Sequence, residues 1–276
     1  MLRINSRGHF FSFDRPAIMG IMNVTPDSFF DGGNYQGLSA IIEHCRKMIS
    51  EGADIIDIGA FSTRPNCGII SAEEETERLI PTLKAVRKEF PDTLISIDTF
   101  RQSIAYQSIE EGADIINDIS GGTFDDEMLP YIGKNHIPYI LMHITGKMET
   151  MHQADIISGN VCEKVRQFFE IQLDKLHSFG EQQIILDPGI GFNKTIECNF
   201  DLLKGIDDYR VNNLPVLIGI SHKSLIFKTL NISPAEATNG TTVLNTIALM
   251  KGADILRVHE VKEAVEARIL VEKSNI

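Results

Sequence analysis

A seven-residue pattern occurs three times in this 276-residue chain and restricts the folds open to it. In each copy a glycine ends a helical pattern, and a short apolar run that finishes on a polar residue follows. We interpret each copy as the end of a helix, a turn and a buried strand. Repetition of one helix–turn–strand unit is typical of folds assembled from βα units. The three copies are Glu51–Asp57 (EGADIID), Glu111–Asn117 (EGADIIN) and Lys251–Arg257 (KGADILR).

Five further apolar runs have the length of buried strands, and a polar residue follows each of them. They are residues 17–22 before Asn23, 94–97 before Asp98, 139–142 before His143, 184–186 before Asp187 and 216–220 before Ser221. Helical patterns lie between the strands, at 38–51, 73–89, 100–110, 126–135, 160–179, 200–203, 225–230, 241–250 and 262–273. Eight apolar strands alternating with helices predict an α/β fold, a (β/α)8 TIM barrel. A doubly wound open sheet is the alternative, because it uses the same units.

The rest of the chain adds a few expectations about organisation and location. Loose alternation over residues 2–14 predicts a short N-terminal β-hairpin ahead of the barrel. No linker-like stretch divides the chain, so we expect residues 1–276 to form a single domain. Neither a leader-like segment nor an 18-residue apolar run occurs, and the four cysteines are scattered, so we expect a cytoplasmic protein. A net charge of −12 argues against nucleic acid and anionic membranes as partners.

In a barrel, the polar residues at the strand ends would meet at one rim, where ligands bind. Carboxylates and amides can recognise a flat heterocycle, and cations can hold phosphate, so the mixture suits a ring that carries an anionic group. Structural alternatives remain open, because Asp57 could tie a turn, His143 could be a core histidine, and Arg257 with His259 could form salt bridges. The rim residues are Asn23, Asp57, Asp98, Asn117, His143, Asp187, Ser221 with Lys223, and Arg257 with His259.

Asp187 occupies the most distinctive of these strand ends. Pro188 follows it and cannot donate to a strand ladder, and Gly189 and Gly191 permit a tight turn close to a ligand. A carboxylate at the end of a buried strand is costly unless it is paired. Asp187 therefore either binds a ligand or caps the following helix.

Seven stretches in order along the chain resemble the dihydropteroate synthase family, the folate-pathway enzymes that sulfonamides inhibit. Together they reach from the first predicted barrel strand to the last, and the complete set is far more specific than any one of them. The stretches are residues 22–29 (MNVTPDSF), 62–65 (STRP), 96–99 (SIDT), 116–122 (INDISGG), 142–143 (MH), 187–192 (DPGIGF), and 221–224 (SHKS) with 257–259 (RVH).

The resemblance implies a transferase that condenses 7,8-dihydropterin-6-ylmethyl diphosphate with 4-aminobenzoate, with Mg²⁺, to give 7,8-dihydropteroate and diphosphate. It also implies a homodimer and inhibition by sulfonamides. The implied pterin ligands are Asp98, Asn117, Asp187 and Lys223. The implied diphosphate ligands are Asn23, Arg257 and His259, and Asn23 also touches Mg²⁺. The implied 4-aminobenzoate pocket consists of Thr63, Arg64, Pro65, Phe192 and Ser221. The implied catalytic residues are Lys223, Asp98, Arg64 and Asp187.

The residue types agree with this chemistry. A carboxylate can accept two parallel hydrogen bonds from the 2-amino and N3–H groups of a pterin. The leaving diphosphate needs cations and a metal to stabilise its developing charge, and the dihydropterin ring can supply the electrons that expel it. We therefore expect a dissociative substitution in which a neutral arylamine attacks a cationic pterin-methylene.

Two other functions would use part of the same pattern. A methyltetrahydrofolate-dependent methyltransferase would share Asp98, Asn117 and Asp187, but would have little use for residues 63–65 or for the cationic pair Arg257 and His259. A non-catalytic pterin-binding barrel is the second alternative.

Four positions depart from the common pattern of the family, and they bear on sulfonamide sensitivity more than on the reaction. They are Phe61, Asn66, Asn193 and His222, of which His222 stands where arginine is common. The polar loops 24–36 and 60–71 contain glycine and few apolar anchors. We expect them to close over the site after the pterin diphosphate has bound.

Overall fold

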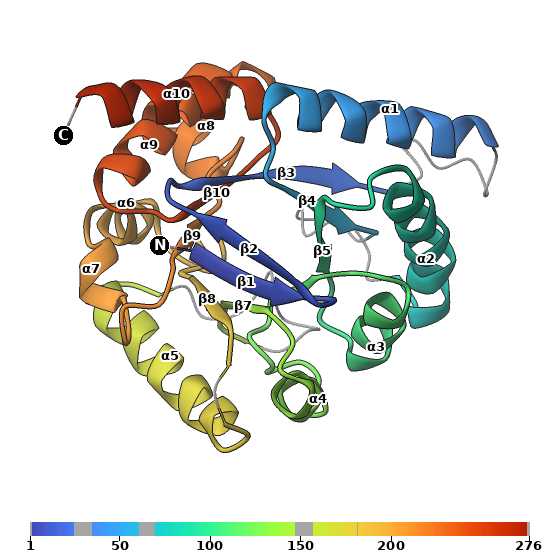
Figure 1. Cartoon of the computed structure of the whole chain (residues 1–276). Helices are drawn as coiled ribbons and strands as arrows, with labels where there is room; N and C mark the ends of the chain where they lie inside the picture. Colours follow the sequence, from blue (N-terminus) through green and yellow to red (C-terminus); the bar gives the residue numbers. More distant parts are fainter. Residues whose placement is uncertain (1, 25–34, 61–69, 147–156, 181, 275–276) are drawn as a thin grey trace.

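Eight parallel strands form one curved sheet with the helices on its outside, as Figure 1 shows. The computed structural model describes residues 2–24, 35–60, 70–146, 157–180 and 182–274. The strands are β3 (Ala17–Asn23), β4 (Ile55–Gly59), β5 (Leu94–Asp98), β6 (Ile115–Asp118), β7 (Tyr139–Met142), β8 (Ile184–Asp187), β9 (Leu217–Ile218) and β10 (Ile255–Val258).

The sheet closes on itself. Its hydrogen-bonded order is β8-β7-β6-β5-β4-β3-β10-β9. A parallel bridge between Leu186 and Val216 joins the two outer strands, and the Leu186 N–H donates to the Pro215 carbonyl at 2.8 Å. The (β/α)8 barrel predicted from the sequence is therefore confirmed, and the open-sheet alternative is wrong.

The helices lie close to the predicted positions, with two differences around residue 200. Thr195 caps α6 through its hydroxyl, which accepts the Cys198 N–H at 3.2 Å, so the helix begins earlier than its apolar pattern suggested. The short helix α7 follows Gly205 and was not predicted. The helices are α1 (Tyr35–Glu51), α2 (Ala72–Glu89), α3 (Gln102–Glu110), α4 (Met128–Asn135), α5 (Val161–His177), α6 (Ile196–Lys204), α7 (Ile206–Tyr209), α8 (Ser224–Leu230), α9 (Thr238–Met250) and α10 (Val261–Ser274). Within the described ranges, no helix is long and apolar enough to cross a membrane.

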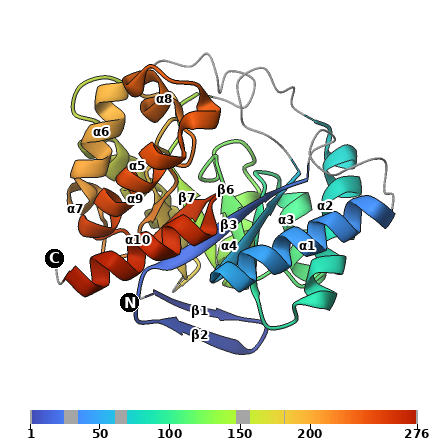
Figure 2. The same cartoon turned by 90° about the horizontal axis from the view of Figure 1, so that it is seen from above.

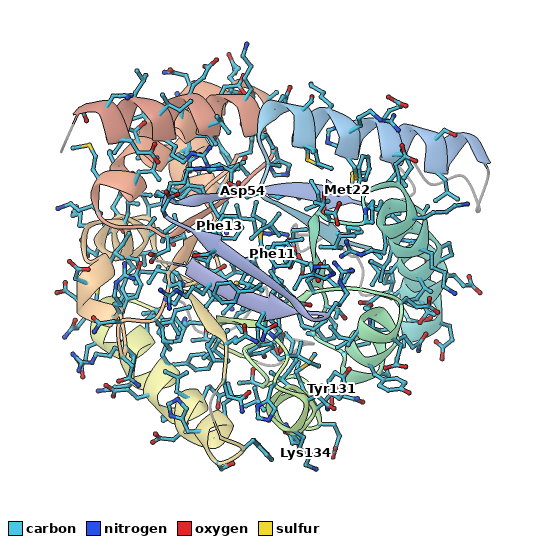
Figure 3. The ribbon with its side chains drawn as sticks, in the orientation of Figure 1. Phe11, Phe13, Met22, Asp54, Tyr131 and Lys134 are labelled. Carbon is cyan, nitrogen blue, oxygen red and sulfur yellow. The ribbon has the colours of Figure 1, made fainter. Side chains whose placement is uncertain are left out.

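The predicted N-terminal hairpin is present and covers one end of the barrel (Figure 2). It consists of β1 (Leu2–Ser6) and β2 (His9–Phe13). Leu2 and Ile4 are buried against the first residues of the barrel strands. Phe11 and Phe13 pack on the same apolar cluster and project over the barrel interior in Figure 3. The hairpin thus seals the end at which the barrel strands begin.

The aspartate in each copy of the repeat links its strand to a neighbouring strand. The aspartate N–H donates to a carbonyl of the neighbour, and the N–H of that same neighbouring residue donates back to the aspartate carboxylate. All of these bonds are 2.8 or 2.9 Å long. The bonded pairs are Asp54 with Ile18, Asp114 with Ile95 and Asp254 with Val216. These two-bond rings align the starts of paired strands.

Arginines neutralise the three carboxylates. Because burial of an unpaired charge is costly, the arginines are needed for the rings to persist. Arg7 comes from the hairpin turn, so its ion pair with Asp114 also attaches the hairpin to the barrel. The pairs are Arg15 and Arg268 with Asp54, Arg7 and Arg87 with Asp114, and Arg210 with Asp254.

We predict that Asp114→Asn destabilises the protein by about 2 to 4 kcal/mol, because it leaves two arginines without their carboxylate and weakens the bond to Ile95. Urea unfolding would measure the loss. Asp174→Asn, on the exposed face of α5, is the matched control and should change stability by less than about 0.5 kcal/mol. Equal effects of the two substitutions would contradict a role for the ring.

Candidate active site

Those predicted site residues that lie within the described ranges are placed at the carboxyl ends of the barrel strands. Asn23 is the last residue of β3, Asp98 of β5 and Asp187 of β8, and Asn117 lies near the end of β6. Asp187 is buried, with 7% of its surface exposed. Thr63, Arg64 and Pro65 lie outside the described residues, as do Phe61, Asn66 and most of the two loops expected to close.

Arg257 connects the two acidic strand ends beside it. Its Nε donates to Asp57 Oδ2 at 2.6 Å, and its Nη2 donates to Asp98 Oδ2 at 2.7 Å. Asn117 Nδ2 also donates to Asp57 Oδ2, at 3.1 Å. Asp57 is fully buried, and its Oδ1 has no hydrogen-bond partner among the described residues. Asp57 therefore belongs to the rim and does not tie a turn, while Arg257 does form the salt bridges considered from the sequence.

Burial shifts the pKa values of acids and bases at the rim in opposite directions. Desolvation raises the pKa of Asp98 to about 7, although Arg257 opposes the shift. Desolvation also raises the pKa of Asp187, against the attraction of Lys223 and the hydrogen bond from Gly189. The pKa of Lys223 falls to about 8, because burial outweighs the attraction of Asp187. Each of these groups would gain from a ligand that supplies complementary hydrogen bonds or charge.

The turn after β8 brings backbone close to Asp187 and Lys223. Asp187 Oδ1 accepts the Gly189 N–H at 2.8 Å, and Lys223 Nζ donates to the Ile190 carbonyl. Gly189 has a φ of +66°, and a Cβ there would lie 2.1 Å from a backbone carbonyl oxygen. Lys223 Nζ also lies 4.7 Å from the centroid of the Phe192 ring, within cation–π range. The ring expected to contact 4-aminobenzoate is therefore adjacent to a lysine expected to contact the pterin.

A second polar network holds Ser221 and His259. Ser221 Oγ lies 2.8 Å from His259 Nδ1 and 3.3 Å from Glu260 Oε2. The other carboxylate oxygen of Glu260 lies 2.7 Å from His222 Nε2. His222 is thus paired with a carboxylate and also bonded to the Pro234 carbonyl. Glu260 was not expected from the sequence, where it is one more acidic residue at the start of a helix.

His143 is buried, as the core-histidine interpretation expects, but its Nδ1 has no hydrogen-bond partner among the described residues. It is 4% exposed and packs edge-on against Phe168, with ring centroids 5.0 Å apart. Burial, and after it the charge of Lys194, lower the pKa of His143 to about 3. The imidazole is therefore neutral at physiological pH and does not contribute a cation to the rim.

Lys194 and Asp118 are further buried polar residues near the rim that the sequence did not single out. Asp118 accepts hydrogen bonds from Ser120 and Gly122, and from Tyr139 at 2.7 Å, which organises the chain after β6. Lys194 donates to backbone carbonyls beneath the turn after β8. A buried lysine has no sequence signature of its own, because only the packing around it decides where its long side chain points.

No group of three or more His, Cys, Asp or Glu side chains within the described ranges could hold a metal ion. A cavity of about 660 Å³ is lined by residues at the starts of α5 and α6 and around α7. Its lining contains none of the predicted site residues. The rim is therefore the part of the described structure in which the predicted residues gather.

Comparison with known proteins identifies the family. A model described as "Pterin binding enzyme" matches residues 19–259, which include every barrel strand except the first two residues of β3. The chain belongs to the pterin-binding enzyme family. The resemblance stated from seven short stretches is confirmed over nearly the whole chain.

Relatives and solved structures that match nearly the whole chain are dihydropteroate synthases. The dihydropteroate synthase of Synechocystis is 45% identical over 90% of this chain and 86% of its own, and that of Escherichia coli is 39% identical over 98% and 96%. The Yersinia pestis dihydropteroate synthase, solved with a sulfonamide drug complex, superposes with a TM-score of 0.90 at 36% identity over 99% of both chains. The Xanthomonas albilineans enzyme with 4-aminobenzoic acid has a TM-score of 0.88 at 31% identity, over 99% of this chain and 98% of its own. Dihydropteroate synthesis, a transferase activity, is the function these similarities support.

The neutral state of His143 makes stability depend on pH. In the unfolded chain its pKa is about 6.5, so the unfolded chain gains a proton below that pH, whereas the folded protein does not until about pH 3. Stability is therefore lost as pH falls from about 6.5 towards 3.

We predict that His143→Gln reduces the loss of unfolding free energy between pH 7.5 and 5 by about 2 kcal/mol. Urea unfolding at the two pH values would measure the difference. His177→Gln, at the exposed end of α5, is the control and should retain the full loss. An unchanged pH dependence in His143→Gln would show that His143 is not held neutral.

Proposed function

We propose that the strand-end rim binds 7,8-dihydropterin-6-ylmethyl diphosphate and transfers its pterin-methyl group to 4-aminobenzoate, releasing diphosphate. The observation that carries this assignment is the meeting of Asp98, Asn117, Asp187 and Lys223 at one end of a barrel of this family. The carboxylates offer the ring acceptors, and the lysine offers it a donor.

In this proposal the carboxylates and the amide bind the ring. Asp187 accepts two parallel hydrogen bonds from the 2-amino and N3–H groups, which stabilises its ionised form and offsets the cost of burying it. Asp98 and Asn117, on neighbouring strands, hold another part of the same edge, with Lys223 as the donor. The pterin thereby gains its orientation before any bond breaks.

Arg257, His259 and Asn23 are assigned to the diphosphate. Arg257 uses Nε and Nη2 for Asp57 and Asp98, and its Nη1 has no hydrogen-bond partner among the described residues, so we assign it to a phosphate oxygen. Asn23 offers an amide oxygen, a hard ligand of the type that Mg²⁺ accepts. Mg²⁺ commonly binds through one or two protein oxygens together with substrate phosphates, so a sparse protein ligand set fits it. The metal would neutralise charge on the leaving diphosphate.

The second substrate is assigned to Phe192 and Ser221 together with Thr63, Arg64 and Pro65. The reaction needs no nucleophilic side chain, because the dihydropterin ring expels the diphosphate and the arylamine attacks the resulting cation. Cys45 and Cys162 agree with this, since burial raises their pKa values to about 12 and about 11. Sulfonamides, as analogues of 4-aminobenzoate, are proposed to compete for this half of the site.

We also propose that residues 1–276 act as one cytoplasmic domain that forms a homodimer. Exposed apolar side chains on the neighbouring helices α8, α9 and α10 support the dimer, because larger exposed apolar surfaces commonly mark interfaces. The exposed residues are Leu230, Val243, Met250, Ile269 and Leu270.

The activity test is an assay for diphosphate release from the pterin diphosphate and 4-aminobenzoate, with and without Mg²⁺. We expect turnover that needs both substrates, rises with Mg²⁺ and is inhibited by a sulfonamide competitively with 4-aminobenzoate. Methyl transfer from methyltetrahydrofolate without diphosphate release would favour the methyltransferase. Pterin binding without either reaction would favour the non-catalytic barrel.

We predict that Asp187→Asn weakens pterin binding at least tenfold, a loss of about 1.4 kcal/mol or more, because it leaves a buried group without its partner. The amide removes the charge and opposes a ring donor with its own N–H groups. Calorimetric titration with an uncharged pterin measures the loss, and Asp174→Asn is the control. Unchanged affinity in Asp187→Asn would exclude Asp187 from the ring site.

A further inference from the structure

Lys194 lies buried beneath the turn that follows β8, and its ammonium group meets three backbone carbonyls. It donates to the carbonyl oxygens of Gly189 at 2.8 Å, Phe192 at 3.0 Å and His143 at 3.3 Å. Only 8% of the residue is exposed. The three N–H groups of a protonated lysine match three acceptors. The first two acceptors lie at either end of the turn, and the third lies just after β7.

The same turn is also held by the rim residue Lys223 and by Asn199 of α6. Lys223 Nζ donates to the Ile190 carbonyl, and Asn199 Oδ1 accepts the Gly191 N–H at 2.7 Å. The Phe192 N–H donates to the Gly189 carbonyl at 3.1 Å, which closes the turn. Two lysines thus bind different carbonyls of one short segment: Lys194 binds those of Gly189 and Phe192, and Lys223 binds that of Ile190.

The residues next to Lys194 tie the turn to a second segment. The Asn193 carbonyl accepts the Ile157 N–H at 2.9 Å, and Asn193 Nδ2 donates to the Thr145 carbonyl at 2.9 Å. Asn193 has a φ of +47°, a left-handed conformation that asparagine tolerates better than most residues. The backbone around Lys194 is therefore fixed on both sides, which leaves the lysine side chain little freedom.

A lysine in this position is costly. Burial lowers the pKa of Lys194 to about 7, with Asp187 opposing the shift, Lys223 adding to it, and Cys198 opposing it. Replacing buried charges with well-packed apolar residues is often neutral or stabilising. Stability alone therefore does not explain a lysine at this position. The three carbonyls that surround its ammonium group do, because only a donor can bind them.

We propose that Lys194 is a positioning residue for the second substrate, because its bonds to Gly189 and Phe192 hold the Phe192 ring against Lys223. The inference rests on the proposed function, in which Phe192 forms part of the 4-aminobenzoate pocket. Lys194 acts through the turn and does not touch either substrate. Asp98, Asn117 and Asp187 belong to strands paired in the sheet, so their placement depends much less on Lys194.

The test is Lys194→Met, which keeps an unbranched side chain one atom shorter and removes its donors. We expect KM for 4-aminobenzoate to rise about tenfold or more, while the calorimetric Kd for an uncharged pterin stays within about threefold. Lys204→Met, an exposed lysine on α6, is the matched control and should change neither. Lys194→Gln restores two donors and should give an intermediate KM.

Other outcomes would overturn the inference. An unchanged KM in a folded Lys194→Met protein would do so, and so would equal losses for the pterin and 4-aminobenzoate. Failure of both Lys194→Met and Lys194→Gln to fold would assign the residue a structural role instead. Absence of diphosphate release from the unsubstituted protein would instead reject the proposed function, so the two failures are distinguishable.

Discussion

The paired hydrogen bonds between the repeat aspartates and neighbouring strands set the register on which the rim depends. A slip of one residue in a strand would turn its side chains to the opposite face. With the starts of paired strands aligned, the final residues of the three repeat copies reach one place. Those residues are Asp57, Asn117 and Arg257, and Asp57 is bonded to both of the others. One short motif therefore supplies both a connection at the base of the barrel and a polar group at its rim.

The rim concentrates buried charge of both signs in a protein whose net charge is −12. Its acids are harder to ionise and its lysines easier to deprotonate than usual, because desolvation opposes both charged forms. A ligand that presents adjacent N–H donors to the acids and an anion to the cations would relieve both penalties. That complementarity supports the proposed binding of a pterin joined to a diphosphate at this rim.

The sequence was informative where the signal was local. Apolar runs and the polar residues that end them predicted the strands and the position of Asp98 and Asp187, because strand burial leaves a direct pattern. It was less informative about contacts between distant segments. The bonds of Asp57, the buried position of Lys194 and the pairing of Glu260 with His222 depend on tertiary packing. The role of Thr63, Arg64 and Pro65 stays a prediction, since they lie outside the described residues.

His222 illustrates how the structure changes the meaning of a departure from the family pattern. From the sequence, His222 was notable only because it stands where arginine is common in the family. In the structure, both ring nitrogens of His222 have partners, Glu260 and the Pro234 carbonyl. Glu260 in turn reaches Ser221, so His222 helps to orient a hydroxyl through a carboxylate. In the proposed site the diphosphate is therefore assigned to Arg257, His259 and Asn23, and His222 acts on the geometry of the second-substrate half.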